Sequence, residues 1–202
     1  KKKKNAVTAA AWVLAQTEKI RVGTAIMQMP ARTPAMCAMT AMSLDQLSGG
    51  RFIVGLGASG PQVVEGWHGV HYGKPVTRTR EYIQIMRKIM AREGPVEFDG
   101  DMYQLPNTGA GTTGLGKPLK SILEGNPNIP IYTASITPAG LRCAGEVADG
   151  VFPVWMDPDK FSILGDHIQK GLDTAGNGKS LSDFDIAPFV SVALNDDLKA
   201  AY

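Results

Sequence analysis

The sequence lacks the long apolar runs and the cysteine and histidine clusters that mark several classes of protein. No stretch of its 202 residues approaches the ~18 consecutive apolar residues that a membrane-spanning helix needs. Its two cysteines, Cys37 and Cys143, lie far apart, and each falls within a helical pattern. The three histidines do not have the spacing of a zinc site. We therefore expect two buried thiols, no disulfide, no metal site and no membrane span.

An excess of one charge is also missing. The 21 Lys and Arg residues nearly balance the 19 Asp and Glu residues, and no basic run alternates with aromatic residues. A nucleic-acid partner is therefore not expected. A hydrophobic fraction of 44% is typical of a soluble globular domain, and no signal-peptide pattern follows Lys1–Lys4. These features predict one domain over residues 1–202, located in the cytoplasm.

What the sequence does contain is an alternation of strand and helix patterns. The predicted strands are Ile20–Met27, Arg51–Gly57, Ile129–Ser135, Gly150–Trp155 and Phe184–Leu194. The predicted helices are Asn5–Thr17, a helix from Pro34 to the turn at Ser48–Gly50, Thr77–Ala91, Pro138–Val147 and Pro158–Ala175. A hairpin over Pro95–Leu105 and an irregular excursion over Pro106–Asn128 form an insertion at about residues 95–128. This order predicts an α/β fold with a parallel sheet and right-handed crossovers.

Two parallel architectures fit this alternation. One is an open doubly wound sheet, and the other is a (β/α)8 barrel. Five strands are too few to close an eight-stranded barrel, and the first predicted element is a helix that should follow a strand. Both facts favour a partial barrel.

Two predicted strands run into loops of small residues. Arg51–Gln62 (RFIVGLGASGPQ) and Ile129–Gly140 (IPIYTASITPAG) each join a buried strand to a loop without bulky side chains. Such a loop lets a ligand approach backbone N–H groups, and the helix start that follows the second loop favours an anion. A plain strand-to-helix turn is the alternative for each loop.

Four stretches, taken in order, resemble the bacterial luciferase-like superfamily. They are Ile20–Pro30 (IRVGTAIMQMP), Leu44–Gly57 (LDQLSGGRFIVGLG), Val63–Gly69 (VVEGWHG) and Leu141–Gly150 (LRCAGEVADG). More narrowly, they resemble its deazaflavin-dependent oxidoreductases, which use coenzyme F-420. The resemblance runs from Asn5 onward and implies a (β/α)8 barrel with an insertion. Strands three to seven of that barrel would lie in this chain, and its first two strands would not.

The resemblance also implies which residues hold the cofactor. A bulge with a cis peptide bond near Ala25–Ile26 would support the ring, the loop after strand four would lie along the cofactor tail, and the loop after strand five would bind its phosphate. The cofactor-binding residues implied in this way are Thr24, Ala25, Ile26, Gly57, Ala58, Ser59, Gly60, Ser135, Ile136 and Thr137. The catalytic acid or base of the family would lie in a segment that this chain does not contain, so no residue is assigned to that role.

The functions implied are of three kinds. The first is an oxidoreductase that transfers a hydride between coenzyme F-420 and a small organic substrate. The second is an FMN-dependent monooxygenase on the same scaffold. The third is a non-catalytic partial barrel that binds phosphate ligands or only self-associates.

Further expectations concern residues outside the loops. We expect a homodimer, as in the family, with Trp12, Met36, Met39 and Met42 near the contact, although Met residues at helical spacing also suit a core. Glu65, Trp67 and His68 face either substrate or solvent. Arg78, Arg80 and Glu81 are expected to form surface or interface pairs, and Asp149 is expected to be a structural cap.

Overall fold

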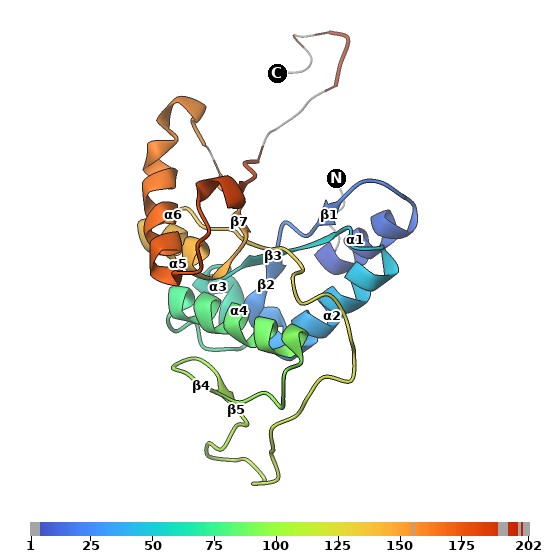
Figure 1. Ribbon diagram of the computed structural model, residues 1–202, viewed down its shortest axis with the longest axis vertical. Helices are drawn as coiled ribbons and strands as arrows, with labels where there is room; N and C mark the ends of the chain where they lie inside the picture. Colours follow the sequence, from blue (N-terminus) through green and yellow to red (C-terminus); the bar gives the residue numbers. More distant parts are fainter. Residues whose placement is uncertain (1–4, 155, 190–193, 198, 200–202) are drawn as a thin grey trace.

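A computed structural model describes residues 5–154, 156–189, 194–197 and 199. Its centre is a parallel sheet with strands in the order β1-β3-β6-β7-β8, and β2 also pairs with β3 (Figure 1). The strands of this sheet are β1 (Val22–Gly23), β2 (Met27–Gln28), β3 (Phe52–Gly57), β6 (Ile131–Thr133), β7 (Gly150–Val151) and β8 (Asp185–Ile186). Every pairing in it is parallel, as the sequence predicts.

Helices follow the strands and pack on one another in chain order. The α-helices are α1 (Ala6–Ala15), α2 (Pro34–Leu47), α3 (Pro61–Val64), α4 (Pro75–Ala91), α5 (Pro138–Val147) and α6 (Ser162–Ala175). The short 3-10 helices are η1 (Met29–Ala31), η2 (Pro158–Lys160) and η3 (Leu181–Asp183). Helix α2 contacts α4, α4 contacts α5, and α5 contacts α6. Within the described residues, none of the helices is long and apolar enough to cross a membrane.

The residues that begin these helices explain where they start. The side chain of Asn5 accepts hydrogen bonds from the N–H groups of Val7 and Thr8, and so caps α1. Thr33 and Thr137 cap α2 and α5 in the same way, each directly before a proline at the first helical position. Proline fits that position because its missing N–H would have no partner inside the helix.

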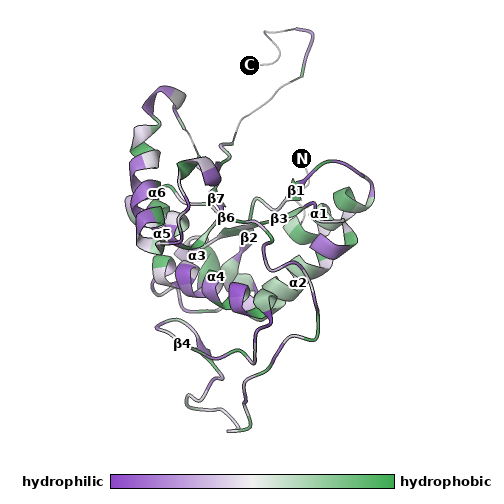
Figure 2. Cartoon of the chain, viewed as in Figure 1, coloured by the Kyte–Doolittle hydropathy of each residue, from purple (hydrophilic) through white to green (hydrophobic). Residues whose placement is uncertain are grey.

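The core lies between the sheet and helices α2 and α4. Phe52, Val54 and Leu56 of β3 are buried together with Met42 of α2 and Tyr82 of α4. Figure 2 shows the hydrophobic colouring of the central strands and the mixed colouring of the helices around them. Met42 is only 1% exposed, so the prediction that it lies near a dimer contact is wrong. It belongs to the core.

Several predicted elements have different boundaries in the structure. The strand predicted over Ile20–Met27 is two strands, because the chain leaves the ladder between β1 and β2. Pro158–Ala175 divides into η2 and α6. Helix α3 was not predicted, and the predicted ends at Trp155 and over residues 190–193 lie outside the described residues.

The insertion is a hairpin followed by an irregular loop. Strands β4 (Phe98–Asp99) and β5 (Gln104–Leu105) pair in antiparallel fashion, and the Gly100 N–H donates to the Tyr103 carbonyl across the turn. The turn is therefore longer than the two residues expected at Asp99–Gly100. Glu81 of α4 holds this turn, because its carboxylate accepts from the N–H groups of Asp101, Met102 and Tyr103.

Asp149 links three parts of the outer layer, so its role is structural, although Ala148 and not Asp149 is the C-cap of α5. The Asp149 carboxylate accepts hydrogen bonds from Arg87 of α4, from Lys179 and from the backbone N–H of Ile131 at the start of β6. Burial raises the pKa of this carboxyl, but the charge of Arg87 and the hydrogen bonds from Lys179 and Ile131 outweigh it. The pKa of Asp149 is therefore lower than the usual value of an aspartate.

We predict that Asp149→Asn lowers the free energy of unfolding at neutral pH by about 1.5–3 kcal/mol, the range for hydrogen bonds to a charged group. Because the folded-state pKa is depressed, this stability is present above the unfolded pKa and is lost as the pH falls through the folded pKa. Urea unfolding between pH 3 and pH 7 measures it. The variant should lose less stability on acidification than the wild type.

The matched control is Asp166→Asn, which removes an exposed aspartate of α6 that forms no ion pair within the described residues. Its stability should follow that of the wild type at every pH. Equal unfolding curves for Asp149→Asn and Asp166→Asn would contradict the structural role of Asp149.

Candidate functional site

The ends of β3 and β6 open into a common cavity of about 200 Å³. These strands are parallel neighbours, with Leu56 paired to Thr133, so the loops that follow them lie at the same edge of the sheet. The cavity is lined by Gly57 at the end of β3 and Ala58 directly after it, and by Ser135, Ile136 and Thr137 after β6. In a parallel α/β fold, this edge is the one at which ligands bind.

The N-terminus of α5 gives this cavity the character of an anion site. The backbone N–H groups of Ser135, Ile136 and Thr137 donate no hydrogen bond to any residue that the structure describes. The Thr137 hydroxyl accepts from the Gly140 N–H at 3.2 Å and so orders the first turn of the ten-residue helix. Free N–H groups and the dipole at such a helix start favour a negatively charged group.

Glycine at position 140 keeps the space in front of this helix open. A Cβ atom there would lie 3.1 Å from Thr137 Oγ1 and 3.2 Å from Ser135 Cβ. It would therefore fill part of the volume between the two hydroxyl-bearing residues. The cavity, the free N–H groups and the missing Cβ together fit a phosphate-sized group.

Charged side chains do not contribute to this cavity. Among the described residues that line it, none is a lysine, arginine, histidine or carboxylate. The titratable groups are Tyr72 and Cys143, and burial raises the pKa of the Cys143 thiol to about 11. That thiol is therefore protonated at neutral pH and does not act as a nucleophile. An anion bound here would depend on backbone N–H groups and hydroxyls.

A bulge between β1 and β2 forms the neighbouring part of the site. The Ala25–Ile26 peptide bond is cis, which confirms the position expected from the family resemblance. Thr24 fixes the bulge on β3, because its hydroxyl donates to the Gly55 carbonyl at 3.0 Å and accepts from the Gly55 N–H at 3.0 Å.

Two glycines of β3 make room for the bulge. A Cβ on Gly55 would lie 1.7 Å from the Thr24 carbonyl oxygen, and a Cβ on Gly57 would lie 2.4 Å from Ile26 Cδ1. The first of these contacts is to the backbone and cannot be relieved by a side-chain rotation. The sequence of β3 therefore determines how closely the bulge approaches the sheet.

Ala25 and Ile26 line a second cavity of about 490 Å³. Trp67 and His68, from the loop after α3, form part of its wall, and His68 Nε2 lies 2.9 Å from Gln28 Oε1. This hydrogen bond orients a ring that can donate or accept a proton. The two cavities adjoin, because Gln28 of the second pairs in the sheet with Gly57 of the first.

The structure brings seven of the ten predicted cofactor residues into these two cavities. Thr24 lines neither of them: it is 1% exposed and is engaged with Gly55. Ser59 and Gly60 also lie outside both linings. Ser59 has a positive φ of 63°, and Gly60 is the cap of α3, so these two residues turn the chain into that helix.

Sequence reasoning missed the start of α4. Tyr72, Pro75, Val76 and Thr79 line the first cavity opposite the loop after β6. The signal was present, because Pro75 directly precedes the amphipathic pattern and marks a helix start two residues before Thr77. Of the three residues expected to face either substrate or solvent, His68 and Trp67 line the second cavity and Glu65 does not.

Comparison with known proteins gives this arrangement its family. A family model with the description "Luciferase-like monooxygenase" matches residues 2–202 of the chain. The chain belongs to the luciferase-like monooxygenase family. One relative is a protein of Mycobacterium tuberculosis that is named as a coenzyme F-420-dependent oxidoreductase. It is 45% identical to this luciferase-like chain over 199 residues. That match covers 98% of this chain and 57% of the relative.

Two archaeal enzymes extend the comparison. A 5,10-methylenetetrahydromethanopterin reductase of Methanolobus tindarius is 31% identical over 92% of this chain and 52% of the relative. The structure of the coenzyme F-420-dependent tetrahydromethanopterin reductase from Methanopyrus kandleri superimposes with a TM-score of 0.76 at 25% identity, over 98% of this chain and 57% of that one. The luciferase-like chain thus spans just over half the length of these relatives, and its curled parallel sheet is part of a (β/α)8 barrel.

We predict that Gly55→Ala destabilises the protein by more than about 2 kcal/mol, because its methyl group would overlap the Thr24 backbone. Thermal and urea unfolding measure the loss. Gly94→Ala is the matched control, since a Cβ there meets nothing within 4 Å. That control should be as stable as the wild type or slightly more stable. Equal stability of the two variants would show that β3 does not need glycine at position 55.

Proposed function

We propose that this chain forms part of an enzyme, an oxidoreductase that uses coenzyme F-420 to transfer a hydride to or from a small organic substrate. The observation that carries the proposal is the pair of adjoining cavities at the ends of β2, β3 and β6. One cavity suits a phosphate and the other contains the bulge at Ala25–Ile26. The relative from Mycobacterium tuberculosis, 45% identical, supports the choice of cofactor.

The first cavity would hold the cofactor phosphate. Its free N–H groups at residues 135–137 can donate to phosphate oxygens, and the hydroxyls of Ser135 and Thr137 lie beside them. Hydrogen bonds to an anion are worth roughly 1.5–3 kcal/mol each, so a few of them suffice for tight binding. The walls supplied by Met29 and Leu56 would keep water from the bound group.

The second cavity would hold the ring and the substrate. A bound deazaflavin supplies the hydride-transfer chemistry, and the protein supplies orientation and exclusion of water. The backbone of Ala25 and Ile26 would support one face of the ring, with Gly57 close behind it. His68, held by Gln28, is the imidazole of this cavity and would form a hydrogen bond with a bound substrate.

FMN-dependent monooxygenase activity is the alternative, and the family description supports it. A monooxygenase of this kind would use the same phosphate site, so the loop after β6 does not separate the two functions. A non-catalytic phosphate-binding chain is the third possibility. Direct titration with both cofactors separates them.

We predict that Ser135→Glu abolishes cofactor binding, because a carboxylate would enter the phosphate site and repel the anion. Titrations of coenzyme F-420 and of FMN into both proteins, followed by fluorescence, measure the effect. Circular dichroism should show unchanged folding, since residue 135 lies in a loop after β6. Ser182→Glu, an exposed position outside the cavity lining, adds the same charge and should bind like the wild type.

Tight binding of coenzyme F-420, weaker binding of FMN and loss of both in Ser135→Glu would support the proposal. Tighter binding of FMN would favour the monooxygenase. Equal binding by the wild type and Ser135→Glu would remove the phosphate site. A folded wild type that binds neither cofactor would favour the non-catalytic alternative.

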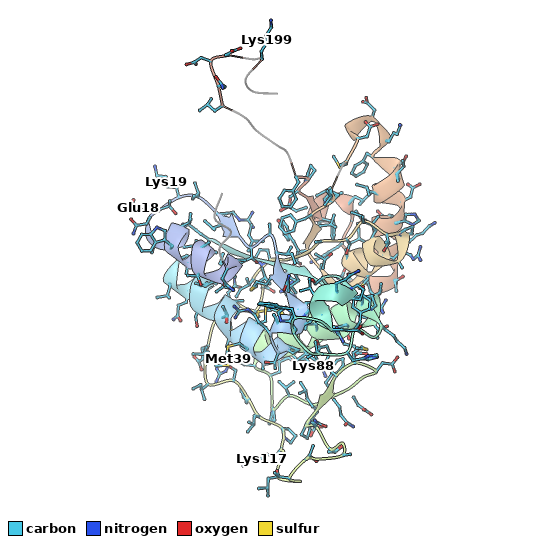
Figure 3. The ribbon with its side chains drawn as sticks, turned by 180° about the vertical axis from the view of Figure 1, so that it is seen from behind. Glu18, Lys19, Met39, Lys88, Lys117 and Lys199 are labelled. Carbon is cyan, nitrogen blue, oxygen red and sulfur yellow. The ribbon has the colours of Figure 1, made fainter. Side chains whose placement is uncertain are left out.

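We also propose a cytoplasmic homodimer. Two free cysteines, both buried, suit a reducing compartment. On α2, Met36 is 54% exposed and Met39 is 36% exposed, next to an apolar groove of about 380 Å³ that Leu119 and Ile122 also border. Figure 3 shows Met39 on α2, above the excursion that carries Lys117. A second copy of this chain would cover these apolar side chains.

We predict that sedimentation velocity shows a dimer for the wild type and that Met39→Glu shifts it to a monomer, because a carboxylate at the contact would have to be desolvated. Leu47→Glu is the control, since Leu47 is 85% exposed at the far end of α2. It should leave the dimer intact. A wild type that stays monomeric at high micromolar concentration would contradict the homodimer.

A further inference from the structure

A third cavity, of about 300 Å³, lies beside the two described above. It shares Met29 with the first cavity, and Ala31 and Arg32 with the second. Apolar side chains, among them Val70 and Met102, form most of its wall. An apolar cavity with a few polar groups that converge on it is the usual form of a small-molecule site.

One of these polar groups, Arg78, is a buried arginine that has no carboxylate partner in the part of the chain that the structure describes. It is 8% exposed, and its Nη2 donates to the His71 carbonyl at 2.6 Å. The other arginines on and directly after α4 are all paired: Arg80 with Glu146, Arg87 with Asp149, and Arg92 with Glu124. Within the described residues, Arg78 and Arg32 form no such pair.

The nearest carboxylate on the same helix is already in use. Glu81 accepts three backbone hydrogen bonds from the turn at Asp101–Tyr103. Asp101, next to the cavity residue Met102 in the chain, pairs with Lys74 at 2.7 Å. Within the described residues, neither guanidinium group therefore has a carboxylate at ion-pair distance, although a buried charge such as that of Arg78 normally has a close partner.

A further hydrogen-bond donor of this cavity is the hydroxyl of Tyr103, and neighbouring side chains hold its ring in place. The Tyr103 ring packs edge-on against Tyr82, with ring centroids 5.9 Å apart. The Tyr82 hydroxyl donates to the carbonyls of Arg32 and Thr33, each at 3.2 Å. The segment that carries Arg32 and the ring of Tyr103 are thus positioned by the same buried side chain.

The geometry points to this third cavity as a binding site for the carboxylate group of a small organic acid. Arg32 and Arg78 provide planar, permanently charged donors that match a carboxylate, and Tyr103 provides a further donor. Met29, Val70 and Met102 provide apolar surface for the carbon skeleton. The site would hold either an acidic substrate or an acidic part of the cofactor.

The test uses benzoate and its uncharged analogue benzamide, titrated into the protein without cofactor and followed by calorimetry and by thermal shift. Benzoate should bind and benzamide should bind at least about tenfold more weakly, because only benzoate gains the charge-assisted hydrogen bonds. Arg32→Gln should weaken benzoate binding by a similar factor, whereas Arg32→Lys, which keeps the charge, should weaken it less. Lys170→Gln removes one positive charge from an exposed position on α6 and should change nothing.

Two further variants localise the effect, because Arg32 also borders the second cavity. Arg78 and Tyr103 line the third cavity and not the second. Tyr103→Phe keeps the ring packing and should weaken benzoate several-fold, and Arg78→Gln should abolish binding if it melts like the wild type. Equal affinities for benzoate and benzamide, unchanged binding in Arg32→Gln and Tyr103→Phe, or no benzoate binding at high millimolar concentration would each overturn the site.

Competition identifies the source of the carboxylate. If coenzyme F-420 displaces benzoate, the cofactor occupies the site; if both bind together, the site belongs to a second ligand. Inorganic phosphate serves as the competing anion, and displacement of benzoate by phosphate at a lower concentration than benzoate itself needs would overturn the choice of a carboxylate. Benzoate binding is measured without cofactor, so a failure of benzoate to bind would not contradict the proposed cofactor site. If Ser135→Glu did not affect cofactor binding, the carboxylate site in the third cavity would likewise not be contradicted.

Discussion

The close contact between β3 and the bulge at Thr24–Ile26 is the constraint on which the rest of the site depends. Glycines at positions 55 and 57 allow it, and the Thr24 hydroxyl fastens it with two hydrogen bonds to Gly55. Since β3 also pairs with β6 on its other side, the same strand positions the bulge and the loop that precedes α5. A displacement of β3 would therefore move both cavities at once. The Thr24 hydroxyl serves this attachment.

Helix α4 carries arginines of two kinds: some form ion pairs that stabilise the fold, and one, Arg78, lines a cavity without such a pair among the described residues. On its outer side, Arg80 and Arg87 join α4 to α5 and to the start of β6 through Glu146 and Asp149. On the side that faces the insertion, the Glu81 carboxylate accepts three backbone hydrogen bonds from the hairpin turn, and Arg78 forms no ion pair with any residue that the structure describes. A guanidinium group that is already paired with a carboxylate of the protein has few free N–H donors for a ligand. The distribution of partners along one helix thus distinguishes fold-stabilising residues from candidate binding residues more clearly than residue type does.

Sequence periodicity was sufficient to predict the parallel strands and the main helices. Their apolar residues recur at strand or helix spacing because one side of each element is buried in any fold of this class. It also located both small-residue loops. The resemblance to the family located the cis bond at Ala25–Ile26. The split of the first predicted strand was missed, because the hydrogen bonds of Thr24 are made with a residue 31 positions away. The prediction that Arg78 and Arg80 form surface or interface pairs with Glu81 was wrong for the same reason. Arg78 and Glu81 are buried against the loop after α3 and the insertion, and Arg80 pairs with Glu146 of α5. Helical spacing alone carries no information about these contacts.

The first and third cavities would hold an anion in two different ways. This difference decides whether one ligand would occupy both cavities or two ligands would bind side by side. At the start of α5, backbone N–H groups and the helix dipole would bind an anion without a charged side chain among the described lining residues, so selectivity there would depend on the size of the space that Gly140 keeps open. In the third cavity, guanidinium groups of Arg32 and Arg78 would bind through net charge and planar geometry. A tetrahedral phosphate suits the first arrangement and a planar carboxylate suits the second. Because the two lie on either side of Met29, a ligand with both groups could span them, whereas an acidic substrate would be held next to a cofactor whose phosphate is already fixed.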